Sequence, residues 1–291
     1  MDKSGSRCIA AGDHLFIFIH AKQMYPLKVV IGETFQTKFG PIKHSDLIGL
    51  RYGTKLTLSK GWVYVLQFTP ELWTLNLPHR TQILYSTDIS MITCYLNLKP
   101  GSVVIESGTG SGSLSHAIMR TIAPNGYLYT FDFHLARADE ARKEFHDHGL
   151  SKLVTVENRD VCSNGFGHQG IADALFLDLP RPWDAIPFAH EAMKSNGSRI
   201  CCFSPCIEQV QKTIQALESF CFVDIETIEL VLRPYEVKTV KLDKFNFTLD
   251  QDKDKSSSSK NDDGAIVSSS ERKRLTKKKA ILQEWTFKRE I

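Results

Sequence analysis

The sequence of 291 residues lacks several features that mark large classes of protein. It has no run of about 18 consecutive apolar residues, the length that a membrane-spanning helix requires. Residues 1–7 are polar and do not resemble a signal peptide. Apolar residues make up 42% and charged residues 24% of the chain, close to the values of ordinary globular proteins. We therefore expect an intracellular, soluble protein with a packed core.

A disulfide framework and a cysteine-based zinc motif are also missing. The seven cysteines are odd in number and irregularly spaced, which is typical of free thiols in a reducing compartment. The segment Cys201-Cys202-x-x-x-Cys206 has no second pair at the spacing of zinc ligands and falls in an apolar, strand-like run. We predict no metal site.

A large excess of charge of one sign is absent, because the formal net charge is only +3. The distribution of charge matters more than this total. Residues 250–270 are rich in Ser, Asp and Lys and nearly free of large apolar residues, so we predict a disordered insertion at about residues 250–280. Residues 272–279 hold six basic side chains and no acid. A solvated charge run is the plain interpretation, and nuclear import or phosphate contact is the alternative.

The chain divides into two regions of different pattern. Residues 1–75 show short strand-like runs broken by glycines, which predicts a small β-barrel or sandwich; the runs are 15–19, 27–31, 54–58 and 62–68. Residues 76–291 are predicted to form a second domain that opens with a helix over 81–98, stopped by Lys99-Pro100-Gly101.

Strands and helices then alternate. The predicted strands are 102–105, 127–131, 153–156, 174–177 and 199–203, and the predicted helices are 113–122, 135–148, 183–194 and 206–218. This alternation predicts an α/β fold with a mostly parallel sheet covered on both faces and a ligand crevice at the carboxyl ends of its strands. Residues 237–242 and 281–288 are predicted to pair in antiparallel fashion and finish the sheet.

A glycine-rich loop follows the first strand of this region. Glu106-Ser107-Gly108-Thr109-Gly110-Ser111-Gly112 stands between a strand and a helix, where glycines let the backbone approach a ligand. The Gly-x-Gly-x-Gly spacing differs from the Gly-x-Gly-x-x-Gly of dinucleotide sites. An acid two residues before it suits the ammonium group of S-adenosylmethionine and would repel a pyrophosphate. Taken alone, the loop is also compatible with a plain tight turn.

Carboxylates stand at the ends of the next strands. Asp132 is placed to hold both ribose hydroxyls of the donor, with a helix-capping aspartate as the alternative. Asp160, followed by Val161, is placed to accept from the adenine amino group, with a loop aspartate as the alternative. Asp178-Leu179-Pro180-Arg181-Pro182-Trp183 combines an acid, a rigid turn and an aromatic ring, which predicts a site for a planar base with an exocyclic amine; a proline-rich loop is the alternative.

These motifs resemble the class I S-adenosylmethionine-dependent methyltransferases, and in detail the catalytic-subunit family of eukaryotic tRNA (adenine-58-N1)-methyltransferases. The resemblance is carried by GWVYVL at residues 61–66, PELWTLNLPHRTQILYSTD at 70–88, the glycine-rich loop, FLD at 176–178 and FSPCIEQVQ at 203–211. It extends from about residue 13 to residue 240.

The resemblance implies an N-terminal β-barrel module followed by a class I, Rossmann-like catalytic domain with a mostly parallel seven-stranded sheet. It implies methyl transfer from S-adenosylmethionine to N1 of adenine 58 in the T-loop of tRNA. It further implies a heterotetramer of two such chains with two non-catalytic, tRNA-binding subunits. The nucleus is the expected location and the cytoplasm the alternative.

The residues and the resemblance together give a predicted site with Asp178 as the catalytic residue. The predicted cofactor-binding set is Gln82, Ile83, Leu84, Tyr85, Ser86, Glu106, Ser107, Gly108, Thr109, Gly110, Ser111, Gly112, Ser113, Leu114, Asp132, Arg137, Asp160, Val161 and Asp178. The predicted substrate-binding set is His20, Gly61, Trp62, Pro180, Trp183, Ser204, Pro205, Cys206, Ile207, Glu208 and Gln209. Similar proteins commonly have glutamate where this chain has Asp132.

Three other functions remain open on the sequence. A methyltransferase acting on a small molecule or protein would keep the glycine-rich loop without needing the site at residues 178–183. A nicotinamide-dependent oxidoreductase would need the dinucleotide spacing. A non-catalytic RNA-binding subunit would keep the fold and lose the donor site. Binding of S-adenosylmethionine or S-adenosylhomocysteine separates these functions.

Overall fold

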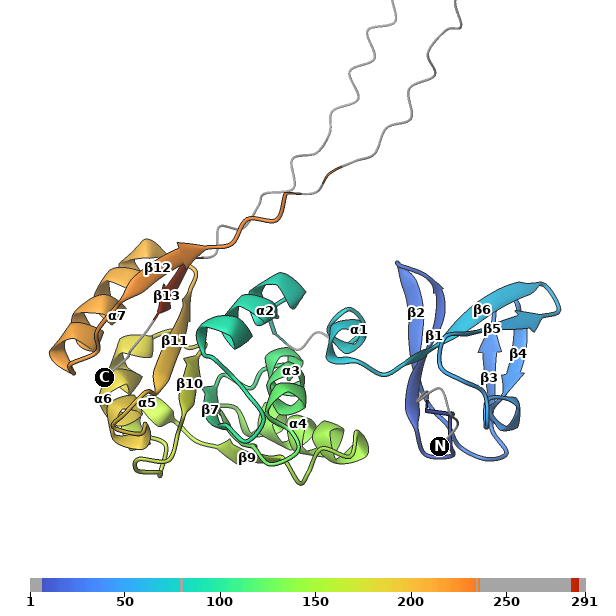
Figure 1. Cartoon of the computed structure of the whole chain (residues 1–291), viewed down its shortest axis with the longest axis horizontal. Coiled ribbons are helices and arrows are strands. Elements are labelled where there is room, and N and C mark those ends of the chain that lie inside the picture. Colours follow the sequence, from blue (N-terminus) through green and yellow to red (C-terminus); the bar gives the residue numbers. More distant parts are fainter. Residues whose placement is uncertain (1–6, 79–80, 234, 236–283, 288–291) are drawn as a thin grey trace, which may run out of the picture. The chain divides into compact units, whose positions relative to one another are not determined.

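A computed structural model describes residues 7–78, 81–233, 235 and the backbone of 284–287 (Figure 1). The predicted insertion, the basic run at 272–279 and the predicted strand at 237–242 lie outside these residues. By their contacts, residues 7–230 and 284–287 belong to one compact unit. Among the helices described, none combines the length and the apolar character needed to cross a bilayer.

The N-terminal region is built from β-strands, as predicted. An antiparallel sheet has the order β2-β1-β6-β5, and a separate hairpin joins β3 to β4. The bounds are β1 (His14–His20), β2 (Gln23–Lys28), β3 (Thr34–Thr37), β4 (Gly40–Lys43), the short 3-10 helix η1 (His44–Asp46), β5 (Thr54–Leu58) and β6 (Gly61–Gln67). Leu15 and Ile17 on β1 and Val63 and Val65 on β6 are buried at alternate positions, so one face of this sheet forms a core.

The strand predicted at 27–31 is wrong in position, because the strand is Gln23–Lys28. Beyond it the backbone N–H of Glu33 donates to the carbonyl of Val30 at 3.2 Å, which closes a turn. The apolar run therefore continues past the end of the strand.

Two helices link the regions, α1 (Pro70–Thr74) and α2 (Ser86–Tyr95). The predicted helix over 81–98 is thus too long at both ends. Tyr85 has an extended backbone, and its N–H donates to the Asp88 carboxylate at 3.3 Å, which fixes the start of α2. Asn97, at φ 50°, ends it. Residues 81–85 are left outside the helix.

The second region contains the predicted parallel sheet. The strands β7 (Val103–Ser107), β8 (Tyr127–Asp132), β9 (Val154–Asn158), β10 (Ala174–Leu177) and β11 (Arg199–Ser204) are parallel, and the full order is β12-β13-β11-β10-β7-β8-β9. At one edge β13 (Glu284–Phe287) runs antiparallel between β11 and β12 (Glu226–Glu229). The five parallel strands confirm the Rossmann-like prediction.

Helices cover both faces of this sheet (Figure 1). On one side α2, α3 (Ser113–Ile122) and α4 (Leu135–Asp147) pack on inward residues of the strands such as Val104 and Phe176. On the other, α5 (Val161–Asn164), α6 (Pro182–Ala192) and α7 (Ile207–Ser219) pack on their neighbours Ile105 and Leu177. Because successive residues of a strand point to opposite faces, each strand serves both cores.

Candidate functional site

The site lies where the order of the sheet reverses. The chain runs from β7 outward to β9 and then returns to place β10 on the other side of β7. Ligands of open α/β sheets bind at the carboxyl ends of the strands at such a switch point. Ser107 ends β7, Asp178 follows β10, and the N–H of Asp178 donates to the carbonyl of Ser107 at 2.9 Å.

The glycine-rich loop is shaped by left-handed backbone and close contacts. Gly108, Gly110 and Gly112 have φ of 97°, 53° and 72°. A Cβ on Gly108 would lie well inside 3.0 Å of the backbone oxygen of Asp178. Glycine is therefore required at residue 108 by both conformation and space.

Glu106 is a buried carboxyl group beneath this loop, with 1% of its surface exposed. Ser115 and Thr130 donate their hydroxyls to its Oε2 at 2.6 and 2.7 Å. Burial raises the pKa of Glu106 to about 7, and the nearby charges of Asp178 and Asp132 add to the rise. A cation placed here would favour the ionised form and lower this pKa.

Asp178 and Asp132 complete a group of three acids. Burial raises the pKa of Asp178 to about 6. Asp132 accepts the N–H of Gly110 at 3.0 Å through Oδ2 and that of His134 at 2.8 Å through Oδ1. It therefore braces the glycine-rich loop, while each oxygen keeps a second lone pair for a ligand.

Two cavities meet at Gly108 and Asp178, which line both of them. The larger, of about 610 Å³, extends over the ends of β8, β9 and β10; it is lined by residues 107–108, 132–134, 137, 159–163, 178–181 and 184. The smaller lies between the glycine-rich loop and the extended segment 81–84, with Glu106 on its wall. The arrangement suits an elongated ligand that extends through both cavities and carries a positive charge beside Glu106.

Comparison with known proteins identifies the family. The model of the family described as "tRNA methyltransferase complex GCD14 subunit" matches residues 61–289. The chain belongs to the GCD14 family.

Curated relatives of this GCD14-family chain include catalytic subunits of tRNA (adenine(58)-N(1))-methyltransferase. The protein from Cryptococcus neoformans is 47% identical over 235 residues, which are 79% of this chain and 54% of that protein. The protein from Dictyostelium discoideum is 45% identical over 249 residues, covering 84% of this chain and 80% of that protein. The chain thus spans about half the length of the Cryptococcus relative.

Solved structures show the same fold. A SAM-dependent O-methyltransferase from Thermotoga maritima has a TM-score of 0.73 at 24% identity, covering 100% of this chain and 97% of that one. The tRNA (m1A58) methyltransferase TrmI from Aquifex aeolicus has a TM-score of 0.68 at 22% identity, covering 98% of this chain and 99% of that one. The GCD14-family chain therefore has a class I methyltransferase fold.

Most of the predicted cofactor-binding residues of this GCD14-family chain line one of the two cavities. They are Gln82, Ile83, Leu84, Glu106, Ser107, Gly108, Thr109, Gly110, Ser111, Ser113, Leu114, Asp132, Arg137, Asp160, Val161 and Asp178. Tyr85, Ser86 and Gly112 line neither. Asp160 also caps α5, since it accepts the N–H of Cys162 at 3.1 Å.

The predicted substrate-binding residues are more scattered. Pro180 lines the larger cavity. His20, Gly61 and Trp62 belong to the N-terminal sheet. The remaining predicted residues, Trp183, Ser204, Pro205, Cys206, Ile207, Glu208 and Gln209, lie at or near the starts of α6 and α7, outside the lining of both cavities.

Two of these predicted residues make contacts that support the turn after β10. Gln209 donates its Nε2 to the carbonyl of Pro180 at 2.9 Å, and Lys212 lies over the ring of Trp183 at 4.9 Å. Their roles toward a substrate stay a prediction.

Several residues of the site were missed from the sequence. Arg159, His134 and Phe133 line the larger cavity, and Thr130 and Ser115 hold Glu106. Thr130 could have been predicted from the sequence, because it lies two positions before Asp132 and therefore on the same face of β8. Arg159 directly precedes the predicted Asp160 in the loop after β9.

Proposed function

We propose that this chain is the catalytic subunit of a tRNA methyltransferase that transfers a methyl group from S-adenosylmethionine to N1 of adenine 58 in the T-loop. Family membership and the two relatives described above support the reaction. The observation in the structure that carries the proposal is the position of Asp178, at the junction of the two cavities.

The residues present fit S-adenosylmethionine. Its ammonium group suits the small cavity beside the buried Glu106, because a cation offsets the charge that burial disfavours there. Its ribose suits Asp132, whose oxygens each retain an acceptor position. Its adenine suits the larger cavity near Val161 and Asp160. When bound, S-adenosylmethionine supplies a methyl group activated by the positive sulfonium.

Asp178 is placed to act on the target base. Adenine N1 is a neutral nucleophile at neutral pH, so no strong base is needed to activate it. The ionised Asp178 accepts from the exocyclic amine, orients N1, and stabilises the positive charge that develops on the ring. Gln209, through the Pro180 carbonyl, holds the turn that carries this carboxylate.

We also propose the finer features that the resemblance implies. The N-terminal strands close into a barrel, and the catalytic sheet counts seven strands. The chain works in a heterotetramer of two catalytic and two non-catalytic, tRNA-binding subunits, and it acts in the nucleus. A partner that grips tRNA agrees with the need to expose an adenine buried in the folded RNA.

Mass spectrometry of nucleosides tests the activity. The chain and its partner are incubated with unmodified tRNA and S-adenosylmethionine, and we expect 1-methyladenine at position 58. Asp178→Ala should bind the donor nearly normally and lose most of the product. Asp184→Ala, which changes another acid of the same cavity, is the matched control. Near-normal turnover of Asp178→Ala with saturating tRNA would contradict the role of Asp178, and absence of 1-methyladenine with the wild type would contradict the function.

A further inference from the structure

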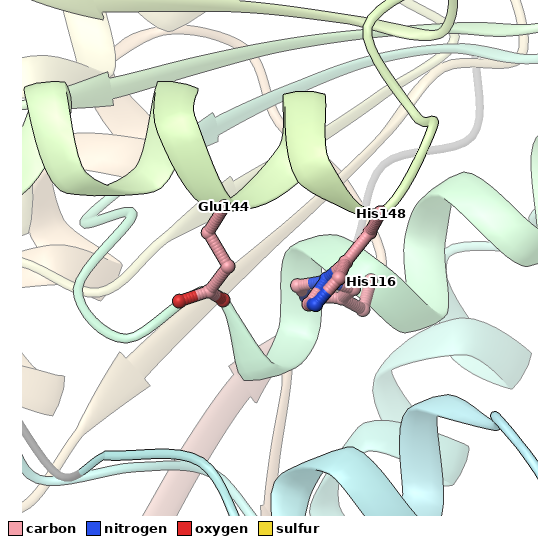
Figure 2. A group of neighbouring side chains, drawn as sticks. All are labelled: His116, Glu144 and His148. Carbon is pink, nitrogen blue, oxygen red and sulfur yellow. The ribbon is translucent and has the colours of Figure 1, made fainter. Parts of the chain in front are cut away.

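Two histidines and a glutamate gather between α3 and the end of α4. His116 lies on α3, Glu144 lies on α4, and His148 directly follows α4. One potential ligand atom from each residue lies within 4.8 Å of the others. Figure 2 shows Glu144 on α4, His148 just beyond the end of this helix, and His116 on the neighbouring helix beside the ring of His148. None of the three lines the cavities of the candidate site.

The hydrogen bonds of His116 define which of its nitrogens is free of a proton. Its Nδ1 lies 2.6 Å from the carbonyl oxygen of Gly112, which can only accept, so Nδ1 carries the proton. The lone pair therefore sits on Nε2, which lies 2.9 Å from Nδ1 of His148. Without an ion, Nδ1 of His148 carries a proton and donates it in a hydrogen bond to Nε2 of His116.

The surroundings are those of a metal site. Ligating histidines usually donate their other N–H to a carbonyl, as His116 does to Gly112, and ligating carboxylates are hydrogen-bonded in turn. Trp73 donates Nε1 to Oε1 of Glu144 at 3.2 Å. The rings of Phe68 and Trp73 both lie 4.7 Å from that of His148, so aromatic side chains limit the access of water.

A third histidine lies beside the pair. The ring of His14 lies 5.0 Å from that of His148, and its buried Nε2 has no hydrogen-bond partner within the described part of the chain. A further nitrogen donor thus stands beside the three residues.

We propose that His116, Glu144 and His148 bind one divalent transition-metal ion, with Zn²⁺ as the ion that this donor set prefers. Bonds of about 2.0–2.1 Å in tetrahedral geometry place ligand atoms about 3.3 Å apart. When the ion binds, the distance between Nε2 of His116 and Nδ1 of His148 therefore increases by a few tenths of an ångström from its present 2.9 Å. His148 moves its proton from Nδ1 to Nε2, so no proton is released.

The ion would have a structural role distinct from methyl transfer. It joins the first turns of α3 to the carboxyl end of α4. Through the N–H of His116 it also fixes the carbonyl of Gly112, the last glycine of the glycine-rich loop.

Cobalt titration of the full chain tests the site. Protein freed of metal with a chelator is titrated with Co²⁺. We expect one equivalent to give the strong visible absorption of tetrahedral Co²⁺ without a thiolate-to-cobalt band, since no cysteine is among the ligands. Zn²⁺ should remove the colour and raise the melting temperature, and the increase should grow with the logarithm of the free Zn²⁺ concentration once that exceeds Kd. His148→Gln should weaken Co²⁺ binding by more than about tenfold.

The control is His146→Gln, which removes an exposed histidine from the same helix and should leave binding unchanged. Because His116 is buried and its replacement risks unfolding, Glu144→Gln provides the second variant, with thermal melting of each protein as the check on folding. Equal Co²⁺ affinity in folded His148→Gln and wild type would overturn the proposal. So would the absence of any saturable visible band, which would leave a hydrogen-bonded histidine pair, or a thiolate band, which would place the ion at cysteines.

Discussion

Gly108 and Asp178 meet so closely that residue 108 has no room for a side chain: a Cβ there would collide with the backbone oxygen of Asp178. This contact joins the glycine-rich loop after β7 to the turn after β10. The glycine-rich loop and the turn that carries the proposed catalytic carboxylate therefore fix each other's position. A substitution in the loop should displace Asp178.

Gly108→Ala tests this relationship, with Gly101→Ala as the matched control. Both glycines have similar positive φ, 97° and 92°, but a Cβ on Gly101 meets nothing within 4 Å. Each substitution should cost about 1 to 2 kcal/mol of stability through left-handed backbone. Gly108→Ala should lose about 1 to 3 kcal/mol more by overpacking and should bind S-adenosylhomocysteine poorly. Calorimetry that gives both variants the same donor affinity would contradict the close contact.

The pH dependence of catalysis should report the ionisation of Asp178. Burial raises its pKa to about 6, and its proposed role requires the carboxylate. The value of kcat/KM for tRNA at saturating methyl donor, where the donor's ammonium group already holds Glu106 ionised, should therefore fall as pH decreases through about 6. Asp184→Asn should keep the same profile. A rate that stays level from pH 7 down to pH 5 would show that catalysis does not require an ionised Asp178.

The stability of the ligand-free protein should depend on Glu106. Burial raises its pKa from 4.5 to about 7, so between these pH values the folded protein holds a proton that the unfolded chain has lost. The free energy of unfolding should thus decrease as pH rises through this window, by roughly 3 kcal/mol in total. Urea unfolding at several pH values should show a shallower decrease for Glu106→Gln. Parallel curves for the two proteins would show that Glu106 titrates normally.

The architecture of the second region was predictable because its signals are local. Alternating apolar runs, the Lys99-Pro100-Gly101 stop and the glycine-rich loop each specify a structure within a few residues. The position of Asp178 at the end of β10 followed from the same pattern, since parallel strands end at one edge of the sheet.

What escaped prediction depends on contacts between distant residues. The helix over 81–98 was overestimated because its apolar spacing continues into residues 81–84, which instead form a wall of the smaller cavity. The hydroxyl of Thr130 and that of Ser115 reach Glu106 across nine or more positions of sequence. No periodicity shows that His116 and His148, 32 residues apart, share a hydrogen bond.

Asp132→Ala should weaken donor binding because it removes both roles of this carboxylate. It removes the acceptor for the N–H groups of Gly110 and His134 as well as the proposed ribose contact. Donor binding should weaken by about 1 to 3 kcal/mol. Asp139→Ala, at an exposed position of α4, should bind the donor normally. Isothermal titration calorimetry measures both, and unchanged affinity in Asp132→Ala would exclude a direct or indirect hold on the donor.

RNA binding should depend on assembly more than on this chain's own charge. The formal net charge of +3 is small for a protein that grips a polyanion. Each phosphate neutralised by Lys or Arg releases counterions, so a complex with many such contacts loses affinity steeply as salt increases. The chain alone should therefore bind tRNA weakly and with a shallow salt dependence, and addition of the proposed partner should increase both affinity and slope.

A salt titration of tRNA binding, with and without the partner, measures this difference. Replacing residues 250–279 by a short linker removes the insertion and the dense basic run together, and we expect it to change methyl transfer only modestly. A large loss of tRNA affinity in that variant would assign the RNA contact to the basic run. If the chain alone binds and methylates tRNA as well as the mixture does at every salt concentration, the partner requirement is wrong, because the balanced charges of this chain would then suffice to hold the RNA.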